Sequence, residues 1–373
     1  MSESTKFDTE VAPERVALSR RRLLRNVGVM GIGAPAMVAL LDACTGGTSS
    51  ADATGSSSSG GVFPGHKKYS FTLVNHVTTN SFFTPTRFGA EDACTLLGCS
   101  YKWTGSANSI VSEMVNAMNS AITSKSDGIA VPVIDKTAFT GPTEKALAQG
   151  IPVVAYNANP PVGSDTPVMS YIGQDNNAAG VAAGQRILKQ VKSGDTVACM
   201  IATPGTGNIQ PRADGAKSVL EPAGINYVQV ATGAAEGAEL SAVEAWFQGH
   251  QKAKFLYAVD SGSGIAVAKT VAKFASTGVK GSGWDVGAPT LQQVQGGKLD
   301  FTIDQQAYIQ GFLPILQLFL YQVSGGLMSP VNTNTGLKFV LKSNVDPYSK
   351  TKNRFEGSSS KAQTLAAPSA IQS

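Results

Sequence analysis

Residues 128–157 read GIAVPVIDKTAFTGPTEKALAQGIPVVAYN and already indicate a class of fold. The stretch begins with an apolar run, Gly128–Ile134, and ends with a second one, Ile151–Tyr156. Between them, Pro142–Gln149 has the pattern of a helix, with proline in its first turn and Gly150 as a stop signal. A strand, a helix and a strand in this order form a βαβ unit, which predicts a parallel sheet.

The same alternation continues on both sides of this unit. Further strands are expected at Tyr69–Val74, Val168–Ile172, Thr196–Ala202, Asn226–Val230, Phe255–Val259, Gly281–Trp284 and Phe301–Asp304. Helices are expected at Asn80–Leu97, Val111–Ile122, Ala178–Val191, Gln210–Leu220, Leu240–Gln248, Gly264–Ser276, Pro289–Gln295 and Tyr308–Val323. A chain of 373 residues is too long for one core, and about ten strands fit two sheets better than one. We therefore predict an α/β body of two doubly wound parallel-sheet lobes.

The composition narrows the class of protein. Lys and Arg number 30 and Asp and Glu number 26, which gives a net charge of +4, and charged residues make up only 15% of the chain. With 42% hydrophobic residues, this excludes a disordered polyelectrolyte, a coiled coil and a collagen-like fibre. So small a net charge argues against nucleic acid as a partner. The 4 cysteines are too few for a disulfide scaffold.

Residues 1–43 have the order of an export signal. A polar stretch containing Ser19-Arg20-Arg21-Arg22-Leu23-Leu24 precedes a moderately apolar run, Val27–Leu41, which is too short for a typical membrane span. The paired arginines followed by two leucines resemble a twin-arginine signal, which exports folded proteins. The alternatives are an ordinary Sec signal or a basic cytoplasmic tail ahead of a poor membrane helix.

The end of the apolar run predicts a lipid anchor. Leu41-Asp42-Ala43-Cys44 resembles a lipoprotein cleavage box, in which the cysteine thiol receives the lipid, although Asp42 departs from the small or apolar residue usual there. A plain peptidase site nearby is the alternative. Residues 44–61 are rich in Gly, Ser and Thr, so they predict a flexible tether between the anchor and the body.

Polar side chains recur where the predicted strands end. These ends are Asn75-His76, Asp135, Asn157, Thr203-Pro204, Asp260-Ser261, Asp285 and Gln305-Gln306. Doubly wound sheets bind ligands at the carboxyl ends of their strands. Two lobes that face one another would therefore line one cleft with these groups.

The motifs of most enzyme and cofactor classes are missing. The sequence contains no G-x-x-x-x-G-K-[ST] loop, no G-x-G-x-x-G after the first strand and no G-x-S-x-G elbow. Its 3 histidines do not form a metal-binding pattern. We therefore expect no catalytic residues, no metal and no cofactor. Two carboxylates, Asp260 and Asp285, keep a carbohydrate-active enzyme open as the least favoured alternative.

Cys94 and Cys99 lie at the end of the first predicted helix and the start of the following strand. In an exported protein this pair could form a local disulfide. A buried pair of free thiols is the simpler interpretation, as it is for Cys199 in its apolar strand.

Five segments occur in a fixed order along the body. They are NSFF (Asn80–Phe83), GIPVVAYN (Gly150–Asn157), YIGQDN (Tyr171–Asn176), GWD (Gly283–Asp285) and FTIDQQ (Phe301–Gln306). Together they resemble the periplasmic sugar-binding proteins of ABC importers, in the ribose-binding-like (type I) family, over residues 66–348. The resemblance implies two lobes that are joined by a three-crossover hinge and close over a monosaccharide or polyol. It also implies their boundaries: residues 62–172 plus 306–333, and residues 173–305 plus 334–348. The remaining residues, 349–373, are rich in Ser, Ala and Lys, and this composition predicts a flexible tail.

The resemblance further implies which residues contact the ligand. By position they are Asn80, Phe82, Phe83, Asn157, Arg212, Asp260, Trp284, Asp285 and Gln305. One of the two phenylalanine rings stacks on the apolar face of the sugar, and the planar fork of Arg212 bonds two adjacent hydroxyls. Asn157 stands where the family has an Asp, and its amide still suits a hydroxyl. Residues 234–236 lack the aromatic ring that often covers the second sugar face, so Trp284 or another aromatic must supply that wall.

The function that the resemblance implies is that of a lipid-anchored, extracytoplasmic solute-binding protein that delivers a sugar to an ABC permease. It acts as a monomer and makes or breaks no bond. A sugar or autoinducer sensor that presents its closed form to a signalling receptor is the second hypothesis. A transcriptional repressor with a similar body is disfavoured, because a signal and a tether occupy the place of its helix-turn-helix.

Overall fold

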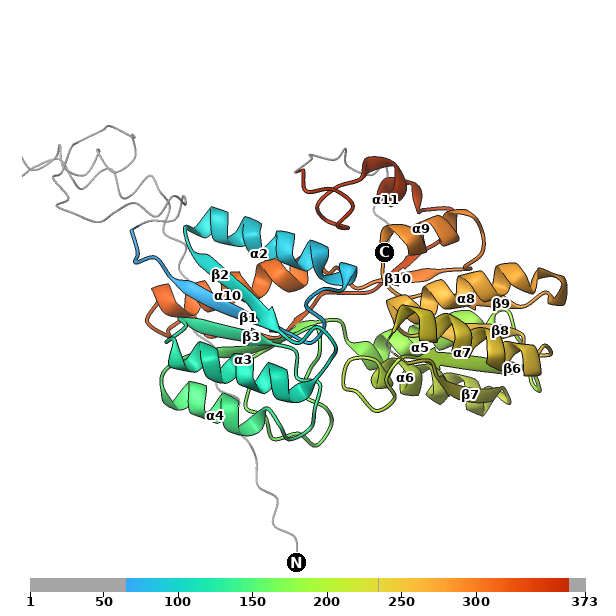
Figure 1. Ribbon diagram of the computed structural model, residues 1–373, viewed down its shortest axis with the longest axis horizontal. Helices are drawn as coiled ribbons and strands as arrows, with labels where there is room; N and C mark the ends of the chain where they lie inside the picture. The colour runs from blue at the N-terminus through green and yellow to red at the C-terminus, as the bar shows by residue number, and fades with distance from the viewer. Residues whose placement is uncertain (1–64, 234, 362–373) are drawn as a thin grey trace, which may run out of the picture. The chain divides into compact units, whose positions relative to one another are not determined.

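The computed structural model describes residues 65–233 and 235–361 (Figure 1). The predicted twin-arginine signal, the anchor at Cys44 and the tether at 44–61 lie outside the described residues. Among the helices that are described, none has both the length and the apolar character needed to cross a bilayer.

The first lobe is built on a six-stranded parallel sheet. Its strands lie in the order β11-β5-β4-β3-β1-β2. They are β1 (Ser70–Asn75), β2 (Ser100–Gly105), β3 (Gly128–Val131), β4 (Val153–Tyr156), β5 (Tyr171–Gly173) and β11 (Thr333–Asn334). Its helices are η1 (Ser81–Phe83), α2 (Thr84–Leu97), α3 (Val111–Thr123), α4 (Thr140–Ala148) and α10 (Ile309–Val323).

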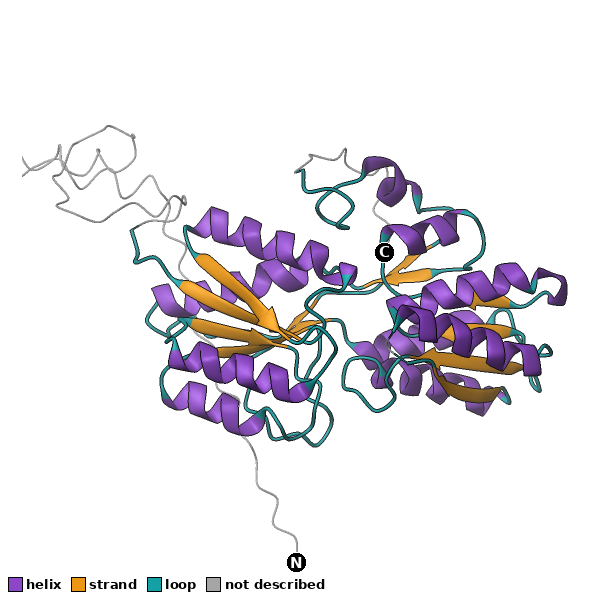
Figure 2. Cartoon of the chain, in the orientation of Figure 1, coloured by secondary structure: helices purple, strands orange, loops and turns teal. Residues whose placement is uncertain are grey.

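Helices cover both faces of this sheet, as Figure 2 shows. In β4, Val154 and Tyr156 pack in the cluster that includes residues of α2 and α10. Their neighbours Val153 and Ala155 pack with residues of α3 and α4 on the opposite face. Burial on both faces explains why the strands are continuous apolar runs.

The second lobe contains a four-stranded parallel sheet in the order β7-β6-β8-β9. Its strands are β6 (Thr196–Ile201), β7 (Asn226–Ala231), β8 (Phe255–Ala258) and β9 (Lys280–Ser282). A parallel bridge between Ser282 and Phe301 adds β10 (Thr302–Asp304), which pairs antiparallel with β12 (Lys338–Val340). The helices are α5 (Asn176–Leu188), α6 (Gln210–Leu220), α7 (Glu236–Gly249), α8 (Ser261–Lys273) and α9 (Ala288–Gln295), with short turns η2 (Glu221–Ala223) and η3 (Ala275–Thr277).

The chain crosses between the two sheets three times: from β5 to α5, from β10 to α10 and from β11 to β12. Glutamine side chains link these crossovers. Gln174 Nε2 donates to the Gly336 carbonyl at 3.0 Å, and Gln306 Nε2 donates to the Thr335 carbonyl. Two α/β lobes with parallel sheets confirm the predicted class of fold.

Glycines bring two pairs of helices into close contact. A Cβ atom on Gly311 of α10 would overlap the Thr86 carbonyl of α2, and a Cβ atom on Gly180 of α5 would overlap the Arg212 carbonyl of α6. Because only glycine permits this approach, the backbones of each pair meet directly. The second contact fixes the part of α6 that carries Arg212.

The C-terminal segment differs from the prediction. The sequence predicts a flexible tail at 349–373, but α11 (Asp346–Thr351) is followed by hydrogen-bonded turns up to Lys361, and the Tyr348 and Arg354 side chains bond to the body. Arg354 forms ion pairs with Glu91 and Asp92. The prediction is therefore wrong for residues 349–361, because an arginine and several turn-forming side chains anchor a stretch whose composition looks unstructured.

Cys94 and Cys99 are both free thiols in the structure, so it contains the thiol pair rather than the disulfide alternative. A hydrogen bond between the two side chains raises the pKa of Cys94, and burial adds to this effect. The same bond lowers the pKa of Cys99.

Candidate functional site

A cavity of about 520 Å³ lies at the carboxyl ends of the strands of both lobes. Its volume is within the range of small-molecule sites. Eight of the nine ligand-contacting residues inferred from the sequence line it: Asn80, Phe82, Phe83, Asn157, Arg212, Asp260, Asp285 and Gln305. The structure thus brings together residues that are up to 225 positions apart (305 − 80) in the chain.

Gln305 connects the two lobes inside this cavity. Its Nε2 donates to Asp285 Oδ1 at 2.6 Å, and its Oε1 accepts from Arg212 Nη2 at 3.3 Å. Asn157 Nδ2 of the first lobe lies 3.5 Å from the same oxygen and donates to Gln310 Oε1 at 3.0 Å. The Gln305 amide, which lies on a crossover, therefore orients polar groups of both lobes.

Arg212 is held from several directions. Its Nε donates to Asn176 Oδ1 and its Nη1 to the Val259 carbonyl, both at 2.9 Å. The guanidinium carbon lies 4.5 Å from the centre of the Trp284 ring. A buried arginine that is fixed in this way presents its remaining N–H groups in one orientation.

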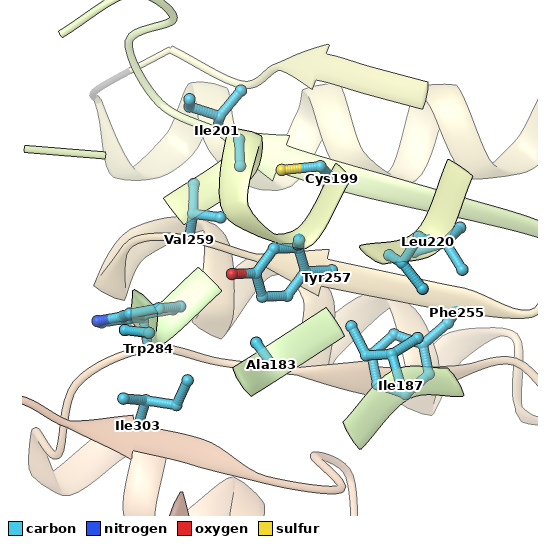
Figure 3. Packing of buried hydrophobic residues seen from close by; sticks show 14 of the residues in the cluster. Ala183, Ile187, Cys199, Ile201, Leu220, Phe255, Tyr257, Val259, Trp284 and Ile303 are labelled. Carbon is cyan, nitrogen blue, oxygen red and sulfur yellow. The ribbon is translucent and has the colours of Figure 1, made fainter. Parts of the chain in front are cut away.

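Trp284 does not line the cavity, so its predicted role as a ligand wall is wrong. The side chain is fully buried and packs with Tyr257, Val259 and Ile303 in the core of the second lobe (Figure 3). Asp285 follows it with a left-handed backbone, which turns the Asp285 side chain to the cavity while that of Trp284 stays in the core. The Trp284 ring packs against the Arg212 guanidinium from the core side.

Asn157 and Asp285 occupy equivalent positions in the two lobes. Each follows a strand and has a left-handed backbone, with φ of 62° and 71°. Asn and Asp tolerate this conformation better than most residues. The turn aims each side chain across the strand ends, toward Gln305.

The electrostatics of Asp285 reflect its burial. Burial raises the pKa of its carboxyl to about 6, while the Arg212 guanidinium and the Gln305 amide act in the opposite direction. The carboxyl is thus ionised at neutral pH and close to its midpoint in mildly acidic solution.

Asp260 also lines the cavity, but its carboxylate caps α8. Oδ1 accepts from the Ser263 backbone N–H at 2.9 Å, and Oδ2 accepts from the Ala202 N–H and the Ser263 hydroxyl, both at 3.0 Å. These contacts join the ends of β6 and β8. Asp260 therefore positions the second-lobe wall, and only its remaining lone pairs can accept a bond from a ligand.

The first lobe supplies an aromatic wall. Phe82 is partly exposed, and its ring meets the buried Phe83 edge to face at 4.7 Å. The Asn80 side chain accepts the Phe82 N–H at 2.9 Å, which fixes the turn that presents the ring. Phe82 is thus the ring available to a ligand, while Phe83 supports it.

His76, at a strand end that the sequence placed in the cleft, and Glu239, which it did not name, are both buried and line the cavity, although neither is among the inferred ligand contacts. Burial, aided by Arg212, lowers the pKa of His76 to about 4, so its ring is neutral at neutral pH. Its Nε2 lies 3.5 Å from Asn208 Nδ2 of the second lobe. The Glu239 carboxylate lies so close to Gly262 that a Cβ atom there would overlap both oxygens. The strand end at Asn75-His76 is a sequence signal for the histidine, whereas no pattern marks Glu239.

The chemistry of this cavity is that of recognition. It offers amide, guanidinium and carboxylate groups beside one aromatic face. Within the described part of the chain, no group of three or more His, Cys, Asp or Glu side chains is arranged to hold a metal ion. Two doubly wound lobes with polar groups converging from both sides define a two-lobed binding protein.

Comparison with known proteins identifies the family. The model of the periplasmic binding protein domain matches residues 71–324, and the chain belongs to this family of binding proteins, which are not enzymes. The chain is 45% identical over 367 residues to the xylose/arabinose-binding protein XylF of Sulfolobus acidocaldarius, covering 92% of this chain and 90% of that protein. It is 26% identical over 209 residues to a D-ribose/D-allose-binding protein of Pseudomonas aeruginosa, covering 55% of this chain and 66% of that protein.

Solved structures agree with this assignment. An ABC transporter solute-binding protein of Burkholderia graminis in complex with D-arabinose superposes with a TM-score of 0.70 at 26% identity, covering 76% of this chain and 99% of that chain. The arabinose-binding protein AraP of Geobacillus stearothermophilus gives a TM-score of 0.63 at 27% identity, covering 76% and 99%.

Proposed function

We propose that this protein binds a monosaccharide, and specifically an aldopentose, in the cavity between its lobes. The observation that carries the proposal is the hydrogen-bonded set of Asn157, Arg212, Asp285 and Gln305, contributed by both lobes. The relative that is 45% identical is named a xylose/arabinose-binding protein, which supports a pentose.

The chemistry of a sugar suits these groups. A pyranose is uncharged, carries hydroxyls that both donate and accept, and has apolar ring faces. Asp285 accepts from a hydroxyl, while Arg212 and Asn157 donate to one. Phe82 offers an apolar surface to a ring face. A ligand that bonds to both lobes binds the closed state better than the open one, and this difference in affinity drives closure.

Isothermal titration calorimetry with D-xylose, L-arabinose, D-ribose, D-glucose and myo-inositol tests the proposal. We expect an aldopentose to bind more tightly than the hexose or the polyol. A hexose or inositol that binds more tightly would overturn the pentose assignment. No binding by any of the five would overturn the sugar-binding proposal itself.

We further propose that the protein delivers its ligand to an ABC permease. Family membership and the resemblance to transporter-associated binding proteins support this role. Deleting the gene should abolish uptake of the radiolabelled sugar. If uptake is intact and only a sugar-dependent transcriptional response is lost, the sensor alternative is correct.

We propose that a twin-arginine signal exports the protein and that Cys44 carries its lipid anchor. Leu41-Asp42-Ala43-Cys44 supports this, and an extracytoplasmic location fits the periplasmic binding protein family. A Cys44→Ser variant should move from the membrane pellet to the soluble fraction after ultracentrifugation, while its sugar affinity stays unchanged. A wild-type protein that is already fully soluble after export would contradict the anchor.

Sugar affinity should fall as the pH falls through 6. In the ligand-free protein the pKa of Asp285 is about 6, and a hydroxyl that donates to the carboxylate binds only its ionised form. Ligand binding then lowers this pKa, and linkage predicts about tenfold weaker binding at pH 5 than at pH 7.5. Calorimetry across this range measures the effect, and an Asp285→Asn variant should lose most of it. An equal loss of affinity in that variant would assign the effect to another buried carboxyl that lines the cavity, Asp260, whose pKa burial also raises.

A further inference from the structure

The segment Asp346–Lys361, here called the strap, is attached to the second lobe at its beginning (Figure 1, dark red). Tyr348 Oη donates to Asp304 Oδ2 of β10 at 2.8 Å. The Tyr348 ring packs against the second-lobe core, and Lys338 Nζ of β12 lies 5.1 Å from its centre. The start of the strap therefore moves with the second lobe.

The strap is attached to the first lobe through Arg354. The guanidinium of Arg354 contacts Glu91 Oε2 and Asp92 Oδ1 of α2, both at 3.0 Å, and lies 4.2 Å from the centre of the Phe88 ring. The Arg354 side chain is only 12% exposed. A bidentate, stacked and largely buried arginine is a stronger link than an exposed surface ion pair.

Hydrogen bonds within the strap stabilise its turns. The buried Glu356 carboxylate accepts the Asn353 and Ser358 backbone N–H groups at 2.6 and 2.7 Å. Gly357 has φ of 83°, and a Cβ atom there would lie 2.7 Å from Cδ of Pro85 in the first turn of α2. The strap backbone at Gly357 thus lies directly against the start of α2.

The helix that the strap holds begins at the binding cavity. The ligand-facing turn η1 leads without a break into α2. The strap also contacts the β10–α10 crossover, where the Phe355 ring meets that of Tyr308 at 4.9 Å. A second cavity, of about 330 Å³, is lined by the strap and by this crossover.

We propose that the strap couples the two lobes and that Arg354 is a positioning residue for ligand binding. Through Arg354 the strap holds α2 in position. This fixes Asn80 and Phe82 relative to the cavity-lining side chains of the second lobe. This role rests on the sugar-binding function proposed above. Arg354 contacts no ligand and acts only through α2.

The test compares three variants of the full chain by calorimetry with the preferred pentose. Arg354→Ala should weaken binding about five- to tenfold. Arg354→Lys keeps the charge but lacks the planar guanidinium that bonds both carboxylates, so its affinity should lie between those of Arg354→Ala and the wild type. Lys350→Ala is the matched control, because it removes an ion pair to Asp346 within the strap itself and should stay within about twofold of wild type.

Hydrogen–deuterium exchange separates positioning from general destabilisation. Arg354→Ala should raise exchange in residues 353–361 and 80–92, while β6 and β8 keep their protection. Unchanged affinity in Arg354→Ala overturns the proposal, as does an equal loss in Lys350→Ala. If the wild type binds no sugar, the sugar-binding function fails separately. Small-angle X-ray scattering without ligand then decides, because a coupling strap predicts a larger radius of gyration for Arg354→Ala, and an unchanged radius refutes it.

Discussion

Replacing Asp285 with asparagine is expected to weaken sugar binding by about a hundredfold, or ~3 kcal/mol, while the protein still folds. The change removes the buried charge that accepts from a ligand hydroxyl and leaves Arg212 without its carboxylate. Asparagine tolerates the left-handed backbone at φ of 71° and can still accept from Gln305. Arg212 keeps its bonds to Asn176 and Val259, so the local structure survives.

Asp195→Asn is the matched control for this prediction. Asp195 accepts the Lys192 N–H in an exposed turn of the second lobe and does not line the cavity. Its variant should bind sugar like the wild type in calorimetry, and circular dichroism should show the same fold for both. If Asp285→Asn binds as tightly as Asp195→Asn, the ligand does not use this carboxylate.

Gly311→Ala is expected to destabilise the protein by ~3 kcal/mol or to prevent folding. The added methyl group would overlap the Thr86 carbonyl, a backbone atom that cannot rotate away. The α2 and α10 helices would have to separate, which opens the core around Ile315 and Phe319. Urea denaturation monitored by circular dichroism measures the loss.

Gly237→Ala makes the same chemical change in α7, where a Cβ atom meets nothing within 4 Å. Replacing an unobstructed helical glycine with alanine should stabilise the protein by up to about 1 kcal/mol. The two variants should therefore change the free energy of unfolding in opposite directions, because only one of the two positions has room for a methyl group. A Gly311→Ala protein as stable as the wild type would show that this helix contact is loose.

The fold could be predicted from the sequence because both faces of each sheet are covered. This arrangement turns β3, β4, β6 and β8 into short apolar runs separated by helical patterns, which are visible without any contact information. The short strands β11 and β12 have no such signal, because they are defined by their partners β5 and β10 rather than by their own residues.

The location of the candidate site was predictable for a related reason. Asn157, Asp260, Asp285 and Gln305 follow strands, and parallel strands place their ends together. Glu239 gave no such signal, because it lies within the first turns of α7 and reaches the cavity only through packing against α8. Trp284 misled the prediction because it precedes Asp285 directly but belongs to the other face. The strap was missed because its anchoring depends on α2, which is distant in the sequence.

Trp284 has a practical consequence for studying the protein. Its indole lies 4.5 Å from the guanidinium of a residue that lines the cavity, yet it is shielded from solvent. Indole fluorescence responds to a nearby charge. A movement of the Arg212 guanidinium on ligand binding would therefore change the fluorescence of Trp284. If the proposed ligand moves Arg212, binding should change the Trp284 part of the emission, measured against the constant background of Trp103 and Trp246.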